Sequence, residues 1–388
     1  MRTLVTLLLL GLCFLPNRYS WAKEVPVETF FRNYNYSGVT LSPDGNYVGT
    51  LSPYHGHLGL AVMDLKTLIP NWACTGDVSW YDWASNDRLV FRPGEDRLCP
   101  FGLMAVNRDG TQEIQLINQY DRTTRFMSLL PHSTNEVLVT SIPASDWKAA
   151  GYYFPDVARM NIFTGTKTRE VANPGQVIEW VTDHEGVVRA GVKIEGRSYH
   201  LLYRSDGSAM WKDILQFDFD SDPYLPVGFE ADNRTLLVAH HGNEQTLGLY
   251  TFDTQAKAIK TLGFRHATAD IDNVWYSNAR QKVVRIGCIT ERPEQYWTIP
   301  EYRTMQESVD HALPGYLNLF RASSKDETKW IVYSYNDLSP GAFYLFDRTS
   351  KVIKKLHRRP ITRKSSGFHF CFRRDLAVHL KTRFRVLT

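Results

Sequence analysis

The feature of this sequence that most constrains its fold is a short hairpin unit that returns along the chain. In its first copy, residues 38–49, two runs with alternating apolar residues flank a Ser-Pro-Asp-Gly turn. Proline presets one backbone angle of such a turn, aspartate can bond to its own backbone, and glycine accepts a left-handed conformation. The unit therefore predicts two antiparallel strands. An apolar run at residues 58–67, which ends in Asp and Thr, completes a predicted sheet of four short strands.

The strand that closes each unit recurs at a nearly constant spacing. Its last polar residue steps by 43, 54, 43, 49 and 94 residues, and a weaker unit near residues 283–299 fills the double gap, so we count seven units. The residues used for this spacing are Asp64, Asn107, Asn161, Arg204, Asp253 and Asp347. A four-stranded sheet repeated every ~40 to 50 residues is typical of a β-propeller.

Each repeated sheet is apolar on both faces, so the sheets must stack against one another around an axis. We therefore predict an all-β fold, a seven-bladed β-propeller of four-stranded antiparallel blades, over residues 36–356. The alternative is a pair of β-sandwiches, which also have short strands and regular turns. A sandwich gives no reason for the constant order of strand, turn, strand, strand and turn, so the propeller is favoured.

The N-terminal residues 1–22 read as a secretory signal peptide. Arg2 precedes an apolar run at residues 3–15, and small residues at 20 and 22 fit a cleavage site. The apolar run is too short to span a membrane. We expect the mature chain to begin near Lys23, with residues 23–35 as a lead-in segment, and to be secreted or periplasmic.

Charge divides the chain into two parts. Residues 351–388 hold twelve Lys or Arg and one Asp, whereas residues 23–350 carry a net charge of −9. A nucleic-acid-binding protein would spread basic residues over its folded surface, so we exclude nucleic acid as a partner. Residues 357–388 also lack the strand and turn rhythm. We interpret them as a basic C-terminal tail, truncated or frame-shifted.

Four cysteines remain after the predicted signal peptide. Cys74 and Cys99 could form a disulfide that joins the first and second sheets, since an oxidising compartment permits one. Buried free cysteines explain the same residues equally well. No cysteine and histidine cluster has zinc-site spacing, so we predict no metal and no cofactor.

Aromatic residues gather in two places. The insert at residues 142–155 carries Trp147, Tyr152, Tyr153 and Phe154, and propeller inserts emerge on one face, where binding sites are built. These four residues are our candidates for contacting a partner, although a hydrophobic plug over a sheet edge explains them as well. In the second unit, Trp80 and Trp83 flank Asp82, and we expect them to pack in the core rather than line the axis of the ring. Residues 301–313 have helical spacing and predict a short helix.

Taken together, the motifs at residues 36–45, 83–91, 106–111 and 339–347 resemble a known family. They are similar to the N-terminal propeller of bacterial prolyl oligopeptidase family serine peptidases, of the secreted dipeptidyl or acylaminoacyl peptidase type. The resemblance covers roughly residues 30–360. It implies a propeller that restricts access to an active site in a second, α/β-hydrolase domain, whose serine lies in a Gly-x-Ser-x-Gly turn.

The sequence contains no Gly-x-Ser-x-Gly, so no catalytic residue follows from the resemblance. We predict the non-catalytic propeller half of such a peptidase, which gates or binds peptide substrates. The alternative is a stand-alone propeller that scaffolds a protein or cell-envelope ligand. A propeller enzyme with carboxylates or a metal at the ring axis is less favoured, because no acidic or histidine cluster is evident.

Overall fold

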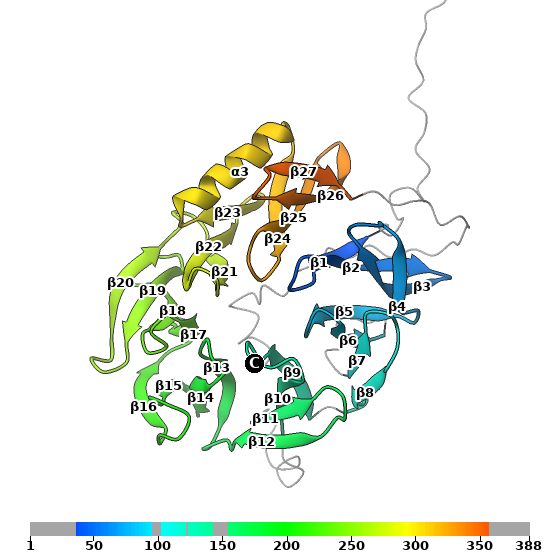
Figure 1. The fold of residues 1–388 in the computed structure, drawn as a ribbon. Coiled ribbons are helices and arrows are strands. Elements are labelled where there is room, and N and C mark those ends of the chain that lie inside the picture. Colours follow the sequence, from blue (N-terminus) through cyan, green and yellow to red (C-terminus); the bar gives the residue numbers. More distant parts are fainter. Residues whose placement is uncertain (1–35, 95–101, 122, 143–153, 357–388) are drawn as a thin grey trace, which may run out of the picture. The chain divides into compact units, whose positions relative to one another are not determined.

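The computed structural model describes residues 36–94, 102–121, 123–142 and 154–356. These residues form seven antiparallel sheets, the blades, which stand in a ring around a central axis (Figure 1). The β-propeller prediction is confirmed, and the β-sandwich alternative is wrong. The predicted signal peptide, lead-in segment and basic tail lie outside the described residues.

The strands follow one another in each sheet in sequence order, so every blade is a meander. Blade one contains β1 (Ser37–Leu41), β2 (Tyr47–Tyr54), β3 (His57–Asp64) and β4 (Pro70–Cys74). Blade two contains β5 (Val78–Trp83), β6 (Arg88–Pro93), β7 (Leu103–Asn107) and β8 (Ile114–Ile117). Blade three contains β9 (Thr124–Leu129), β10 (Glu136–Ser141), β11 (Asp156–Asn161) and β12 (Lys167–Val171). Blade four contains β13 (Val177–Thr182), β14 (Val188–Glu195), β15 (Ser198–Tyr203) and β16 (Lys212–Phe217).

The last three blades continue the pattern with one variation. Blade five contains β17 (Leu225–Phe229), β18 (Leu236–His240), β19 (Gly248–Asp253) and β20 (Ala258–Phe264). Blade six contains β21 (Ile271–Ser277), β22 (Lys282–Ile289) and β23 (Pro293–Trp297), followed by helix α3 (Pro300–Ala312). Blade seven contains β24 (Leu317–Ser323), β25 (Lys329–Asn336), β26 (Ser339–Asp347) and β27 (Val352–Lys355).

Blade six has three strands, so the prediction of four strands is wrong for this blade. The chain leaves β23 into α3, the helix predicted from the spacing of residues 301–313, which lies along the outer edge of the ring (Figure 1). Tyr302, Met305 and Val309 form its buried face and pack with Trp297 and Trp330. The helix thus covers apolar surface between blades six and seven.

Apolar clusters fill the spaces between neighbouring blades. One cluster joins blades one and two through Leu51, Leu60, Tyr81 and Phe91, and another extends over blades four, five and six. Blades seven and one are separate sheets, and no strand of one pairs with a strand of the other. The ring is therefore closed by side chains such as Ile331 and by hydrogen bonds between the two blades. Since burial of apolar area is the main favourable term in folding, each blade is stabilised by its neighbours.

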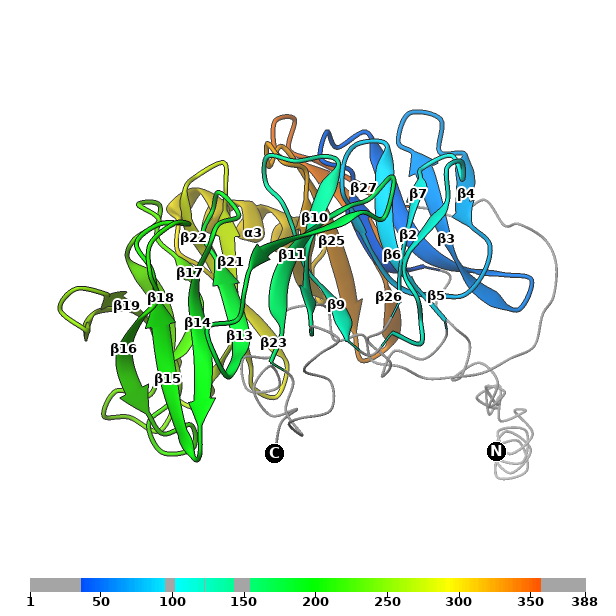
Figure 2. The ribbon, with the colours of Figure 1, turned by 90° about the horizontal axis from the view of Figure 1, so that it is seen from below.

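The strands connect two opposite faces of the ring (Figure 2). The turn face carries the hairpins between first and second strands and those between third and fourth strands. The connector face carries the hairpins between second and third strands and the links between blades. Because the meander starts and ends there, β1 begins and β27 ends at the connector face.

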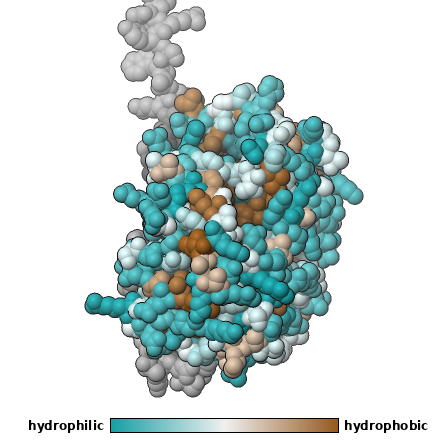
Figure 3. All heavy atoms as spheres, turned by 90° about the vertical axis from the view of Figure 1, so that its left-hand side faces the viewer, coloured by the Kyte–Doolittle hydropathy of each residue, from teal (hydrophilic) through white to brown (hydrophobic). Residues whose placement is uncertain are grey.

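The outside of the ring is largely hydrophilic, as Figure 3 shows for one side, where hydrophobic residues form scattered groups. Outer strands account for this surface. In β12, four of five residues are exposed, and in β20 five of seven are. A strand at a sheet edge that faces water needs few apolar residues.

Candidate functional site

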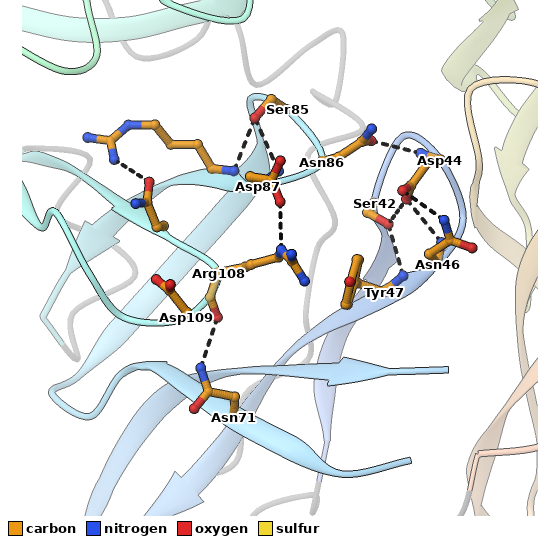
Figure 4. A network of polar contacts seen from close by, with 12 residues as sticks. Ser42, Asp44, Asn46, Tyr47, Asn71, Ser85, Asn86, Asp87, Arg108 and Asp109 are labelled. Carbon is orange, nitrogen blue, oxygen red and sulfur yellow. Dashed lines mark hydrogen bonds and ion pairs between the residues drawn. The ribbon is translucent and has the colours of Figure 1, made fainter. Parts of the chain in front are cut away.

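The turn face is tied together by its own repeated turn. In the first copy, Ser42 Oγ donates to Asp44 Oδ1 over 2.6 Å and accepts the Tyr47 backbone N–H over 3.0 Å (Figure 4). Although burial raises it, hydrogen bonds from Ser42 and Asn46 leave the pKa of Asp44 below its ordinary value. These Ser and Asp side chains therefore stabilise the turn.

Neighbouring turns are also linked to each other. The Asp44 N–H donates to Asn86 Oδ1 over 3.0 Å between blades one and two (Figure 4). Between blades four and five, the His184 N–H donates to Asn233 Oδ1, also over 3.0 Å. Between blades seven and one, the Lys325 N–H donates to the Pro43 carbonyl over 2.8 Å. The turn face thus serves the structure of the ring.

An arginine strengthens the first of these links. Arg108 lies 4.0 Å from the centroid of the Tyr47 ring, and its Nε donates to Asp87 over 2.7 Å. Its carbonyl accepts a hydrogen bond from Asn71, which belongs to blade one (Figure 4). Blade two is therefore fastened to blade one by the ring contact with Tyr47 and the backbone contact with Asn71, while the ion pair with Asp87 holds Arg108 within blade two.

The connector face is the better candidate for binding, because its loops carry the predicted insert. Of the four aromatic candidates, Phe154 is half-buried and packs against the core cluster of blades four to six. Trp147, Tyr152 and Tyr153 lie outside the described residues, so their contact with a partner stays a prediction. For Phe154, packing in the core fits the plug interpretation.

Of the two cysteines of the predicted disulfide, Cys74 belongs to this face as well. Cys74 ends β4 and is half-buried, and burial raises the pKa of its thiol. Cys99 lies outside the described residues, so the pairing stays a prediction. Cys288 is buried, and desolvation raises the pKa of its thiol to about 12, which makes it an inert core residue.

The inner strand of blade two brings together the residues around Trp80 that the sequence singled out. Alternation along β5 sends Trp83 toward blade one, where its Nε1 donates to Thr40 Oγ1 over 3.1 Å. Trp80 faces blade three instead, and its ring lies 5.0 Å from that of Phe126. Core packing is thus confirmed for Trp83, which is buried, whereas Trp80 is half-buried.

Asp82 is an ionisable group of unusual character on the same strand. It is half-buried, and desolvation raises the pKa of its carboxyl from 3.8 to about 6, although the Trp83 N–H donates to its Oδ1 over 2.8 Å. Sequence analysis noticed this residue only as a neighbour of two tryptophans. A single polar residue between aromatic residues gives no sequence signal that its carboxyl is desolvated on the inner strand of a blade.

Arg92 is a functional candidate that sequence analysis missed. It lies near the end of β6 at the connector face, opposite Trp80 in the sheet register, and its guanidinium is 5.1 Å from the centroid of the Trp80 ring. Burial and the nearby charge of Arg125 lower the pKa of Arg92. Two like charges near one another, beside an aromatic ring, are suited to an anionic ligand.

Among the residues that the structure describes, no group of three His, Cys, Asp or Glu could hold a metal ion. In the same part of the chain, no helix has the length and apolar character needed to cross a membrane.

Comparison with solved structures identifies the type of propeller. One of two prolyl endopeptidases studied for the role of inter-domain dynamics in catalysis and specificity matches 83% of this chain with 49% of its own, at 9% identity and a TM-score of 0.54. The fold is that of the propeller region of prolyl oligopeptidase-family peptidases. Prolyl oligopeptidase B from Galerina marginata matches over 83% of this chain and 50% of its own, at 10% identity and a TM-score of 0.52.

A puromycin-hydrolyzing peptidase from Mycobacterium tuberculosis matches over the same region, with 83% of this chain, 53% of its own, 12% identity and a TM-score of 0.51. The chain thus spans about half the length of the solved structures it matches. No protein-family model and no curated protein matches the sequence. The resemblance seen in the sequence motifs is confirmed at the level of the propeller fold.

Proposed function

We propose that this chain is the non-catalytic propeller half of a prolyl oligopeptidase-like serine peptidase and that it binds or gates peptide substrates. The observation that carries the proposal is the fold match, which is restricted to about half of each solved peptidase. The topology supports it, because the propeller is entered at β1 and left at β27 on the same face. A catalytic domain joined to both ends of the propeller would lie over the connector face.

The expected chemistry is selective binding without bond cleavage. The sequence provides no Gly-x-Ser-x-Gly turn for a nucleophile. A serine-reactive fluorophosphonate probe should therefore leave the purified chain unlabelled. Labelling of any serine would refute the non-catalytic assignment.

Binding is tested with a short fluorescent peptide and with a folded protein that displays the same peptide sequence. We expect the fluorescence anisotropy of the labelled peptide to rise when it binds the chain. The folded protein should not displace the peptide. Alanine at Trp147, Tyr152 and Tyr153 should weaken binding, whereas Met210→Ala, an 86% exposed apolar residue on the turn face, should not. Equal competition by the folded protein would refute gating.

The second candidate is a stand-alone scaffold for a protein or cell-envelope ligand, which the same aromatic insert favours. A pull-down from envelope extract tests the scaffold. It is favoured over the peptidase half if one specific protein is recovered with the parent and with Met210→Ala but not with the triple alanine variant. For both candidates we propose a secreted or periplasmic location, on the basis of the predicted signal peptide at residues 1–22. N-terminal sequencing of the exported chain should then begin near Lys23.

A further inference from the structure

Arg92 differs from other arginines that lie over aromatic rings in this ring of blades. Within the described ranges, the others also donate to a carbonyl or a carboxylate. Arg88 lies over Phe163 and donates to the Ile162 carbonyl, and Arg204 lies over Trp211 and donates to the Val188 carbonyl. The same combination of ring and acceptor occurs for Arg108, Arg265, Arg280, Arg285 and Arg348.

Arg92 shares the aromatic contact of the other arginines, but its Nε has no hydrogen-bond acceptor among the described residues. Its guanidinium lies over Trp80, and its Nε is buried without a hydrogen-bond partner in the described part of the chain. A buried donor without an acceptor is costly, and more so when it is charged. An acceptor supplied by a ligand would remove that cost.

The surroundings of Arg92 favour an anion with an apolar neighbour. The positive charge of Arg125, on the first strand of blade three, lies close enough to disfavour the charged form of Arg92. Trp80 is held by Phe126, with ring centroids 5.0 Å apart, so the aromatic surface beside the guanidinium is fixed. Position also matters, since Arg92 and Trp80 are both half-buried at the connector-face end of their strands.

We infer that Arg92 binds a carboxylate of a peptide ligand, with the adjoining apolar part of the peptide against Trp80. This inference rests on the proposed peptide-binding function and names the chemical group that the site selects. A guanidinium matches the two oxygens of a carboxylate with two parallel N–H donors, which a lysine ammonium cannot do. The carboxylate comes from the C-terminus of a peptide or from an acidic side chain.

The test compares peptides that differ only in this charge. A labelled peptide is titrated as the free acid, as the C-terminal amide, and as an amide with one internal glutamate. We expect the amide without glutamate to bind about tenfold more weakly than the free acid, the range for one hydrogen bond to a charged group. The amide with glutamate separates the two sources of the carboxylate, because it recovers affinity only if a side chain is accepted.

The variants use Arg92→Gln, Arg92→Lys and the matched control Arg234→Gln, an exposed arginine on the turn face of blade five. Arg92→Gln should lower the affinity for the free acid about tenfold and leave the affinity for the amide unchanged, with Arg92→Lys in between. Arg234→Gln should change neither. Thermal unfolding checks the fold, and Arg92→Gln should be at least as stable as the parent without ligand, because it removes an unpaired charge.

The outcomes separate this inference from the function on which it rests. Equal affinity of the parent for acid and amide, or an unchanged acid affinity in Arg92→Gln, overturns the carboxylate site and leaves peptide binding intact. Displacement of both peptides by inorganic phosphate, with no preference for the acid, also overturns it. Failure of every peptide to bind refutes both proposals.

Discussion

The raised pKa of Asp82 makes the stability of the ring depend on pH in an unusual direction. Its carboxyl has a pKa of about 6 in the folded protein against 3.8 ordinarily, because burial disfavours the charge. The folded state therefore holds a proton that the unfolded state releases between these two values. The protonated carboxyl of Asp82 therefore contributes its full stabilisation to the folded state below about pH 4, and this stabilisation is lost as the pH rises through 6.

The magnitude follows from the two values. The folded and unfolded pKa values of Asp82 differ by about 2 units, and each unit is worth about 1.36 kcal/mol. The charged carboxyl therefore lowers the free energy of unfolding by about 3 kcal/mol at pH 7. Asp82→Asn removes the ionisation and keeps an oxygen that can accept the Trp83 N–H. We therefore expect the variant to match the parent in free energy of unfolding near pH 4 and to exceed it by about 3 kcal/mol at pH 7.

Denaturant unfolding of both proteins between pH 4 and 7 measures this difference. A control of opposite sign is Asp64→Asn, because backbone N–H groups of Lys66 and Thr67 lower the pKa of Asp64, which is half-buried at the end of β3. Relative to the parent, that variant should be destabilised by an amount that stays constant between about pH 5 and 7 and shrinks as the pH falls to 4 and below. A difference between Asp82→Asn and the parent that stays constant over the whole pH range would refute the reasoning.

Two further predictions concern the closure of the ring and the geometry of blade seven. Lys329 Nζ donates to the Gly45 carbonyl over 2.8 Å between blades seven and one, so Lys329→Met should cost about 1 to 2 kcal/mol. Hydrogen exchange should then accelerate in blades one and seven and not in blade four, and uniform acceleration would contradict a local joint. Gly341 has φ +92, and a Cβ there would lie 2.8 Å from Tyr335 Cβ, so Gly341→Ala should lower the unfolding free energy by about 1 to 3 kcal/mol. An unchanged denaturation midpoint would contradict this.

The second and third strands of the blades could be predicted because they are largely buried on both faces and carry the apolar signal. Strands such as β18 (Leu236–His240) are buried at every residue. The fourth strands were predicted in the wrong place: the four strands expected within residues 38–67 are three in the structure, and β4 (Pro70–Cys74) follows the polar turn that ends them. In β12 (Lys167–Val171) and β20 (Ala258–Phe264) most residues face water, so their sequences lack the alternation that identifies a strand.

The site was harder to predict than the fold, for a different reason. That Trp80 and Trp83 face opposite sides follows from strand alternation alone, so this part was available from the sequence. The pairing of Arg92 with Trp80 depends on the register of β5 and β6, which contains a shift between Val78 and Trp80. The missing acceptor of Arg92 is a property of three-dimensional packing and has no sequence signal.

The two faces of the ring divide stability from binding. On the turn face, linked turns such as those of Asp44 with Asn86 and His184 with Asn233 connect blades directly, so substitutions there should act on the whole ring. On the connector face, the buried Nε of Arg92 has no hydrogen-bond partner in the described ranges. Because its buried charge is a cost to the free protein, a structural role does not explain its position. Ligand binding does, and this difference is why loss of Arg92 should weaken binding without weakening the fold.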